Sequence, residues 1–79
     1  MGLSKSEREL AGRAARFLKA ELKRANVTYD ELATRLKDHG LTETRDSVAA
    51  KLKRGTFAAT FLLACLAALE LDGISLEDI

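Results

Sequence analysis

The sequence predicts a compact all-α fold of four to five helices, and three observations lead to this prediction. Apolar residues recur at intervals of three and four, which is the helical period, and strict alternation is absent. The chain has 79 residues, of which 47% are hydrophobic, so it can form one core and a single domain, 1–79. Capping residues and glycines divide it into five segments, at about 5–25, 28–39, 43–54, 57–70 and 75–79.

The segment 5–25 is expected to be an amphipathic helix. Ser4 and Glu7 match a capping box at its start, and Asn26 can end it in the left-handed conformation. Gly12 lies inside it and can mark a close helix crossing. The expected core stripe consists of Leu10, Ala14, Phe17, Leu18, Leu22 and Ala25. The opposite side carries Arg8, Arg13, Arg16, Lys19, Lys23 and Arg24.

The segment 28–39 has the same kinds of helix start and stop signals. Thr28 and Glu31 match a second capping box, and Gly40 is expected to end the helix. Its core face is Leu32, Ala33 and Leu36.

The segment 43–54 can be capped by Thr42 or Thr44 and is expected to end at Gly55. Val48 and Leu52, four residues apart, face the core, so the helix shows its other side to solvent.

The segment 57–70 is apolar on nearly every side, which predicts a central helix with the others packed around it. Spacing assigns Phe17, Phe57 and Phe61 to the core. Asp72 and Gly73 then signal a turn, and Ser75 is expected to cap the last short turn, 75–79.

Charge is distributed unevenly along the chain. Residues 1–54 hold all 13 Lys and Arg against 8 Asp and Glu, whereas residues 55–79 hold four acids and no Lys or Arg. This favours a protein that presents one end to phosphates, although a solvated surface explains the same counts. The amino-terminal residues do not match a secretory signal, and the single cysteine fits a reducing compartment, so a cytoplasmic location without membrane insertion is expected.

Four runs of sequence resemble lambda-repressor-like (Xre-type) helix-turn-helix domains. They are VTYDELA at 27–33, LKRG at 52–55, FL at 61–62 with ALEL at 68–71, and ISLEDI at 74–79. The chain also resembles an uncharacterised family of short bacterial domains with this plan. It differs from the Xre-type pattern in having six residues, 34–39, before the turn glycine where three are usual, and in having Tyr29 for the usual Gln and Phe57 for a common proline.

The resemblance implies that segments 28–39 and 43–54 form the helix-turn-helix pair, with the second helix in the major groove of duplex DNA. A helical wheel of segment 43–54 turns Asp46, Ser47, Ala50, Lys53 and Arg54 outward, with Lys51 at the flank, and all of these except Asp46 are candidate base or groove contacts. Thr28, Tyr29 and Thr44 lie at helix starts, where phosphates or sugars can bind, and helix 5–25 adds backbone contacts. The complete set of candidate DNA-binding residues is Arg16, Lys19, Lys23, Thr28, Tyr29, Thr44, Arg45, Ser47, Ala50, Lys51, Lys53 and Arg54.

The sequence argues against an enzyme. The only histidine, His39, is far along the chain from Cys65, and neither a glycine-rich phosphate loop nor a metal-ligand spacing occurs. Cys65 is interpreted as a small core residue and His39 as a residue at a helix end. No cofactor, metal ion or small-molecule substrate is therefore expected.

We expect a small DNA-binding protein, a transcriptional regulator or nucleoid-associated factor that can act as a homodimer. The alternative is a protein–protein interaction or dimerisation module of the same fold. In that case the interface would come from the apolar carboxy-terminal half, with Leu71, Ile74, Leu76 and Ile79 as candidates.

Overall fold

The computed structural model describes residues 5–79, apart from the side chains of Lys5 and Asp78. Within this range the chain forms four α-helices and two short 3₁₀-helices. In chain order they are α1 (Lys5–Ala25), α2 (Tyr29–Leu36), η1 (Lys37–His39), α3 (Arg45–Arg54), α4 (Ala59–Ala68) and η2 (Leu76–Asp78). Strands are absent from this range, so the predicted all-α class is confirmed. Within it, no helix is both long and apolar enough to cross a bilayer.

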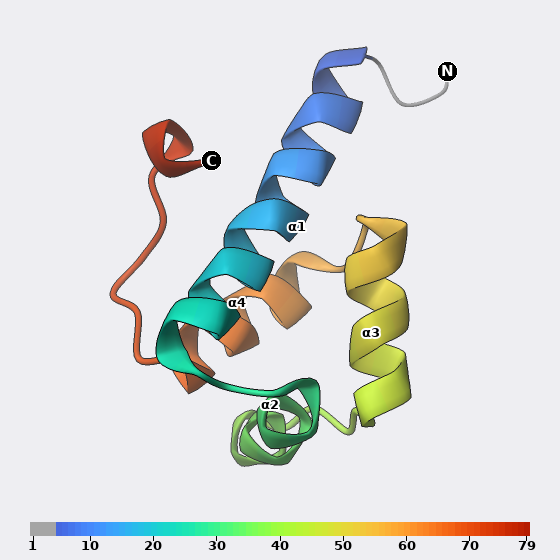
Figure 1. Cartoon of the computed structure of the whole chain (residues 1–79), viewed down its shortest axis with the longest axis vertical. Helices are drawn as coiled ribbons and strands as arrows, with labels where there is room; N and C mark the ends of the chain where they lie inside the picture. Colours follow the sequence, from blue (N-terminus) through green and yellow to red (C-terminus); the bar gives the residue numbers. More distant parts are fainter. Residues whose placement is uncertain (1–4) are drawn as a thin grey trace.

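The long helix α1 determines the shape of the molecule (Figure 1). In this view α3 lies to one side of α1, α4 crosses behind it, and α2 closes the lower end. Helix α2 packs against both α3 and α4, and α1 contacts α3. After α4 the chain returns along the side of α1 that faces away from α3, so the C-terminal segment and α3 flank α1 on opposite sides.

Each of the four α-helices contributes aliphatic or aromatic side chains to one core. Burying each of the larger ones stabilises the fold by about 1.5–3 kcal/mol relative to an exposed position. Seven side chains are essentially inaccessible to solvent: Leu18, Leu32, Leu36, Val48, Leu52, Phe61 and Cys65. Phe57 and Tyr29 are half-buried and pack against this cluster.

The buried face of α1 is narrower than the sequence predicts. Ala15, Leu18 and Leu22 form it, whereas Leu10 is 47% exposed and Ala25 is exposed. The prediction that Leu10 and Ala25 belong to the core was wrong. Phe17, also predicted there, is half-buried and lies on another side of α1, where it lines a cavity instead of packing against the core cluster. The first turns of α1 project beyond the other helices (Figure 1), so no helix is positioned to cover Leu10.

Helix α4 is not surrounded on all sides, contrary to the prediction. Phe61, Cys65 and Leu66 are buried, but Leu63 is 61% exposed. Ala59 and Ala67, one turn before and after Leu63, are also exposed. We call these three residues the α4 stripe. An almost uniformly apolar composition could not reveal which side of the helix would lack neighbours.

Four helical segments end at a residue with positive φ. Asn26 (φ 58°), Gly40 (φ 81°) and Gly55 (φ 82°) follow α1, η1 and α3, as predicted, and Glu70 (φ 58°) follows α4. The amides that come next along the chain donate back to helical carbonyl oxygens, as from Val27 to Leu22 and from Leu71 to Leu66, both at 2.9 Å. Glu70 fell inside the predicted helix because glutamate is not a usual stop signal.

The six residues 34–39 complete α2 and form η1, and Gly40 then redirects the chain toward α3. Arg35 fixes this region: one guanidinium nitrogen donates to the carbonyl oxygen of Ala68 at 3.1 Å, and another pairs with Glu31 at 2.6 Å. The extra residues are therefore ordered helix that is tied to the C-terminal end of α4.

Candidate functional site

Three basic residues form a continuous stripe along α1. Arg16, Lys19 and Lys23 are spaced three and four residues apart, so they share one side of the helix. All three are exposed, and none joins an ion pair within residues 5–79 as described. At 1.5 Å per residue the stripe spans about 10 Å along the axis. We call it the α1 basic stripe.

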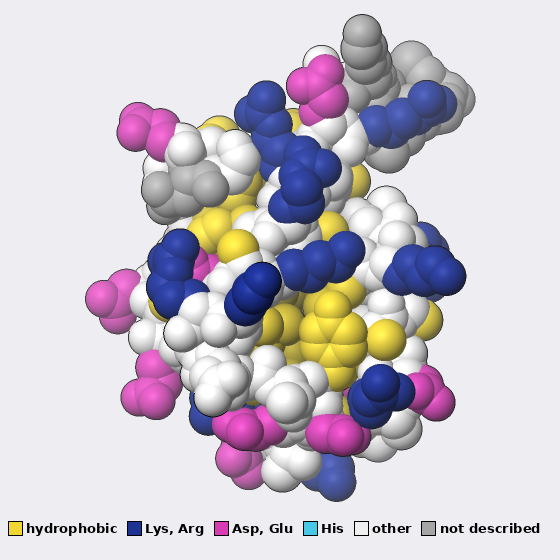
Figure 2. Space-filling model, in the orientation of Figure 1, with side chains coloured by type: hydrophobic (Ala, Val, Ile, Leu, Met, Phe, Trp, Pro, Cys, Tyr) yellow, Lys and Arg dark blue, Asp and Glu magenta, His cyan; other side chains and the backbone are white. Residues whose placement is uncertain are grey.

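The face shown in Figure 2 carries a group of positive side chains. Lys and Arg side chains gather over α1 and around an apolar patch between α1 and α3, while acidic side chains lie mainly around the edge, over α2 and along the left side, with one near the upper end of α1. Because α1 and α3 lie side by side on this face (Figure 1), an extended polyanion laid across it would meet both helices.

The start of α3 is fixed by a capping box between Thr44 and Ser47. The Thr44 hydroxyl accepts from the Ser47 amide at 3.1 Å, and the Ser47 hydroxyl accepts from the Thr44 amide at 2.8 Å. Thr44 is thus the cap, rather than Thr42, and the helix begins at Arg45. The guanidinium of Arg45 lies 3.3 Å from the Asp46 carboxylate, and both side chains are exposed.

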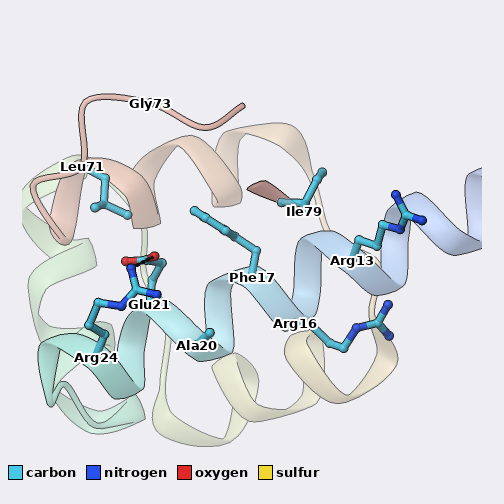
Figure 3. Close-up of a pocket in the computed structure, with 9 residues that line it drawn as sticks. All are labelled: Arg13, Arg16, Phe17, Ala20, Glu21, Arg24, Leu71, Gly73 and Ile79. Atoms are coloured by element: carbon cyan, nitrogen blue, oxygen red, sulfur yellow. Dashed lines mark hydrogen bonds and ion pairs between the residues drawn. The ribbon is translucent and has the colours of Figure 1, made fainter. Parts of the chain in front are cut away.

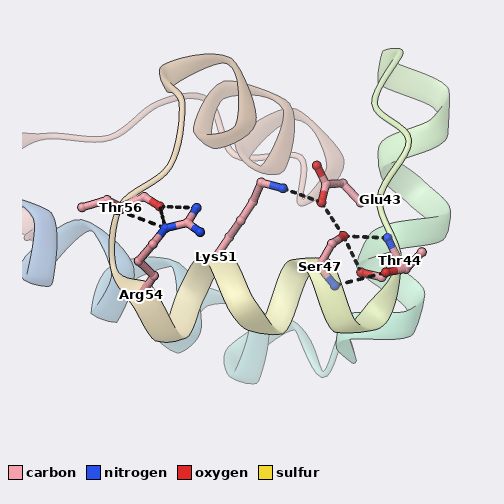
Figure 4. A network of polar contacts seen from close by, with 6 residues as sticks. All are labelled: Glu43, Thr44, Ser47, Lys51, Arg54 and Thr56. Atoms are coloured by element: carbon pink, nitrogen blue, oxygen red, sulfur yellow. Dashed lines mark hydrogen bonds and ion pairs between the residues drawn. The ribbon is translucent and has the colours of Figure 1, made fainter.

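Glu43 and Lys51 form the best-protected ion pair of the described residues (Figure 4). Lys51 Nζ lies 3.0 Å from Glu43 Oε1, and the Glu43 side chain is only 8% exposed. Ser47 also donates to Glu43, at 2.6 Å. Burial alone would raise the pKa of Glu43, but hydrogen bonds from Ser47 and Lys51 and the Lys51 charge together hold it below its ordinary value of 4.5.

The C-terminal end of α3 has two exposed cations, of which Arg54 is held by hydrogen bonds within the chain. The Arg54 guanidinium donates to the carbonyl and hydroxyl oxygens of Thr56 at 3.1–3.2 Å (Figure 4). Lys53 and Ala50 are exposed. The outer face of α3 therefore offers a small contact set in which Lys53 is the least engaged cation.

The start of α2 is used for structure. The Thr28 hydroxyl accepts from the Glu31 amide at 3.1 Å, as expected, but the Glu31 carboxylate pairs with Arg35 instead of completing a capping box. Tyr29 is half-buried against the core. Ser4, the predicted cap of α1, lies outside the described residues. Gly12 meets no crossing helix: an added Cβ would come closest, at 3.3 Å, to Arg16 Nη1.

Two features of the site escaped sequence analysis. Glu43 was placed inside the predicted helix, yet it precedes the cap and reaches Lys51, eight residues away, which no helical spacing signals. The second feature is a cavity beside α1 that includes Arg13 and Arg24. Their spacing with Phe17 and Ala20 on one side of α1 was the available signal.

Cys65 and His39 show no catalytic arrangement. Burial, with a smaller contribution from the negative charge of Glu43, raises the pKa of the Cys65 thiol to about 12, so the thiol stays protonated near neutral pH. His39 is exposed in η1. No group of three His, Cys, Asp or Glu residues suited to a metal ion occurs among the residues that the structure covers.

Comparison with known proteins finds one family. Residues 10–74 match a family described as a domain of unknown function (DUF6471). No curated protein and no solved structure matches the chain.

Proposed function

The chain belongs to the DUF6471 family, and we propose that it is a helix-turn-helix protein that binds duplex DNA, with α1 contacting phosphates and α3 facing the groove. The observation that carries this proposal is the α1 basic stripe: three exposed cations without intramolecular ion pairs in the described residues, on a helix that lies beside α3. Exposed cations free of internal partners can neutralise phosphates and release their counterions.

The pairing of α2 with α3 supports the helix-turn-helix part of the proposal. The two helices pack against each other, and the segment between them is ordered by η1 and Gly40. Helix α3 keeps one side in the core through Val48 and Leu52 and leaves the other side accessible. This is the disposition that a groove-binding helix requires.

The contacts available on α3 argue for weak sequence discrimination. Lys51, Arg54 and Ser47 are engaged by neighbouring groups, and Arg45 lies against Asp46. Ala50 and Lys53 remain as the simplest contacts to base edges or the groove. Phosphate contacts would therefore supply most of the affinity, as for a nucleoid-associated factor.

The test is fluorescence anisotropy with a labelled mixed-sequence duplex, from about 50 to 200 mM salt, where each phosphate contact contributes about 0.9 to the slope of log K against log salt. Lys19→Glu with Lys23→Glu should reduce that slope by about two contacts' worth. The single variants Lys19→Glu and Lys37→Glu are compared as well, because both reverse one exposed charge and Lys37 lies on η1, away from the α1 basic stripe. A slope near zero for the wild type, or equal losses of DNA affinity in these two single variants, would overturn the proposal.

The α4 stripe supports a second candidate function, a dimerisation module of the same fold. Leu63 is a large apolar side chain that is 61% exposed between two exposed alanines, which allow close helix approach. We expect a concentration-dependent dimer in sedimentation equilibrium that Leu63→Lys abolishes. Leu76→Lys, which replaces a leucine that is 78% exposed on η2, is the matched control. A monomer at all concentrations would exclude this candidate.

A further inference from the structure

A cavity of about 700 Å³ lies between α1 and the segment that follows α4 (Figure 3). One wall is the side of α1 that carries Phe17 and Ala20, and the other contains Leu71, Gly73 and Ile79. This wall of α1 faces away from the core stripe Ala15, Leu18 and Leu22. The volume falls within the range of pockets that enclose small organic molecules.

The cavity has charged side chains at both ends and an apolar middle. Figure 3 shows the Arg13 and Arg16 side chains toward one end, Arg24 with Glu21 at the other, and Phe17 projecting between them. Glu21 lies 2.8 Å from Arg24, so their charges compensate. Arg13 is 3.8 Å from Glu9, and that exposed pair is loose.

Arg16 is the better-placed anion ligand of the two. It is exposed and has no ion-pair partner in the described part of the chain. Its guanidinium lies against the bare backbone of Gly12, where an added Cβ would come within 3.3 Å of Nη1. Two guanidinium groups beside apolar walls suit a carboxylate or phosphate, which arginine can bind through two parallel hydrogen bonds.

We propose that this cavity binds a small amphipathic anion. The carboxylate or phosphate lies between Arg13 and Arg16, and an aromatic ring or short aliphatic chain lies against Phe17, Leu71 and Ile79. Inorganic anions would gain only the charged contacts, and neutral apolar molecules only the apolar ones. The inference does not rest on DNA binding, since it needs no nucleic acid and shares only Arg16 with the α1 basic stripe.

The test is an NMR titration of the full chain, labelled with nitrogen-15, in the absence of nucleic acid. Phenyl phosphate and octanoate are the amphipathic probes, which separate phosphate from carboxylate ligands. Inorganic phosphate, acetate and benzyl alcohol are the controls. We expect saturable shifts in amides of residues 13–24 and 71–79. At least one amphipathic probe should bind about tenfold more tightly than every control, because both kinds of contact are then used.

Variants locate the site. Arg13→Gln should weaken binding of the better probe about fivefold or more, and Phe17→Ala should do the same, because they remove the charged and apolar contacts separately. Arg8→Gln, an exposed arginine that does not line the cavity, should change nothing. Far-ultraviolet circular dichroism establishes that each variant is folded. Three results would overturn the proposal. The first is that phenyl phosphate binds no more tightly than inorganic phosphate and octanoate no more tightly than acetate. The second is an equal loss of affinity in Arg8→Gln and Arg13→Gln, and the third is a titration that does not saturate.

Discussion

Lys51 Nζ lies 3.0 Å from the Glu43 carboxylate and 5.6 Å from the centroid of the Phe61 ring. One cation on α3 thus joins the loop before that helix to the aromatic residue in the first turn of α4. The cation is attracted both by the carboxylate and by the face of the ring. Lys51, a candidate DNA contact by sequence, therefore serves to hold α3 against its neighbours.

Removing the Glu43 charge should destabilise the protein. Glu43→Gln leaves Lys51 partly buried without its partner and weakens the hydrogen bond from Ser47, so the free energy of unfolding in urea should fall by about 1.5–3 kcal/mol at neutral pH. Glu9→Gln is the control, because its pair with Arg13 is exposed and 3.8 Å long, and it should change stability by less than about 0.5 kcal/mol. Equal effects would contradict this role for Glu43.

The same pair predicts a pH dependence. The pKa of Glu43 is lower in the folded state than its ordinary value of 4.5, so the ionised carboxylate stabilises the fold above that value. This contribution is lost as the pH falls through the lowered pKa, when the folded protein also takes up the proton. Urea unfolding of the wild type and Glu43→Gln should show a stability difference that shrinks below pH 4.5. A constant difference down to strongly acidic pH would be incompatible with the assignment.

Glu70→Gly should stabilise the protein. Glu70 has φ 58°, a left-handed conformation that costs a residue with a Cβ about 1 kcal/mol relative to glycine. We expect a gain of about 0.5–1 kcal/mol in the free energy of unfolding. Glu70→Ala separates backbone strain from loss of the side chain, because alanine retains the Cβ and should give no such gain. Similar gains in both variants would show that the carboxylate, and not the backbone, is the cause.

Cys65 should be unreactive in the folded protein. Its side chain is fully buried and its pKa is raised to about 12, so neither access nor thiolate is available near pH 8. A chromogenic disulfide reagent should modify it only as fast as the protein opens, and at once in denaturing urea. Rapid modification without denaturant would contradict the packing of α4.

Two leucines on α4 test the exposure of that helix. Leu66 is 5% exposed and Leu63 is 61% exposed. Leu66→Ala should lower the free energy of unfolding by about 2–5 kcal/mol through loss of burial and cavity formation. Leu63→Ala should cost about 0.5 kcal/mol or less, measured below the concentration at which any dimer forms. Similar costs would indicate a helix enclosed on both sides, as its composition first suggested.

Capping residues in the sequence predicted the ends of the helices well. How the helices pack against one another could not be predicted in this way, because it depends on contacts between distant segments. Thr28, Thr44, Asn26 and Gly40 occupy the helix ends at which their chemistry predicted them, because capping involves neighbouring residues only. The exposure of Leu10 and Leu63 could not be derived in this way. Both have the hydrophobicity of a core residue, and they are exposed because of how the neighbouring elements are placed.

The candidate site divides in the same manner. Helical spacing was enough to place Arg16, Lys19 and Lys23 on one side of α1. It could not reveal that Lys51 would be engaged by Glu43, because that contact joins a loop to a helix across eight residues. Nor could it reveal the cavity, whose second wall comes from residues 71–79 near the far end of the chain.

Arg16 belongs to two surfaces of the protein. It lines the cavity beside α1 and also begins the exposed stripe that continues through Lys19 and Lys23. A single guanidinium cannot complete two anion sites at once, so occupants of the two surfaces would be antagonists. Thermodynamic reciprocity then requires each ligand to weaken the binding of the other by the same factor. Through this one side chain, a small anion in the cavity would reduce the affinity for nucleic acid.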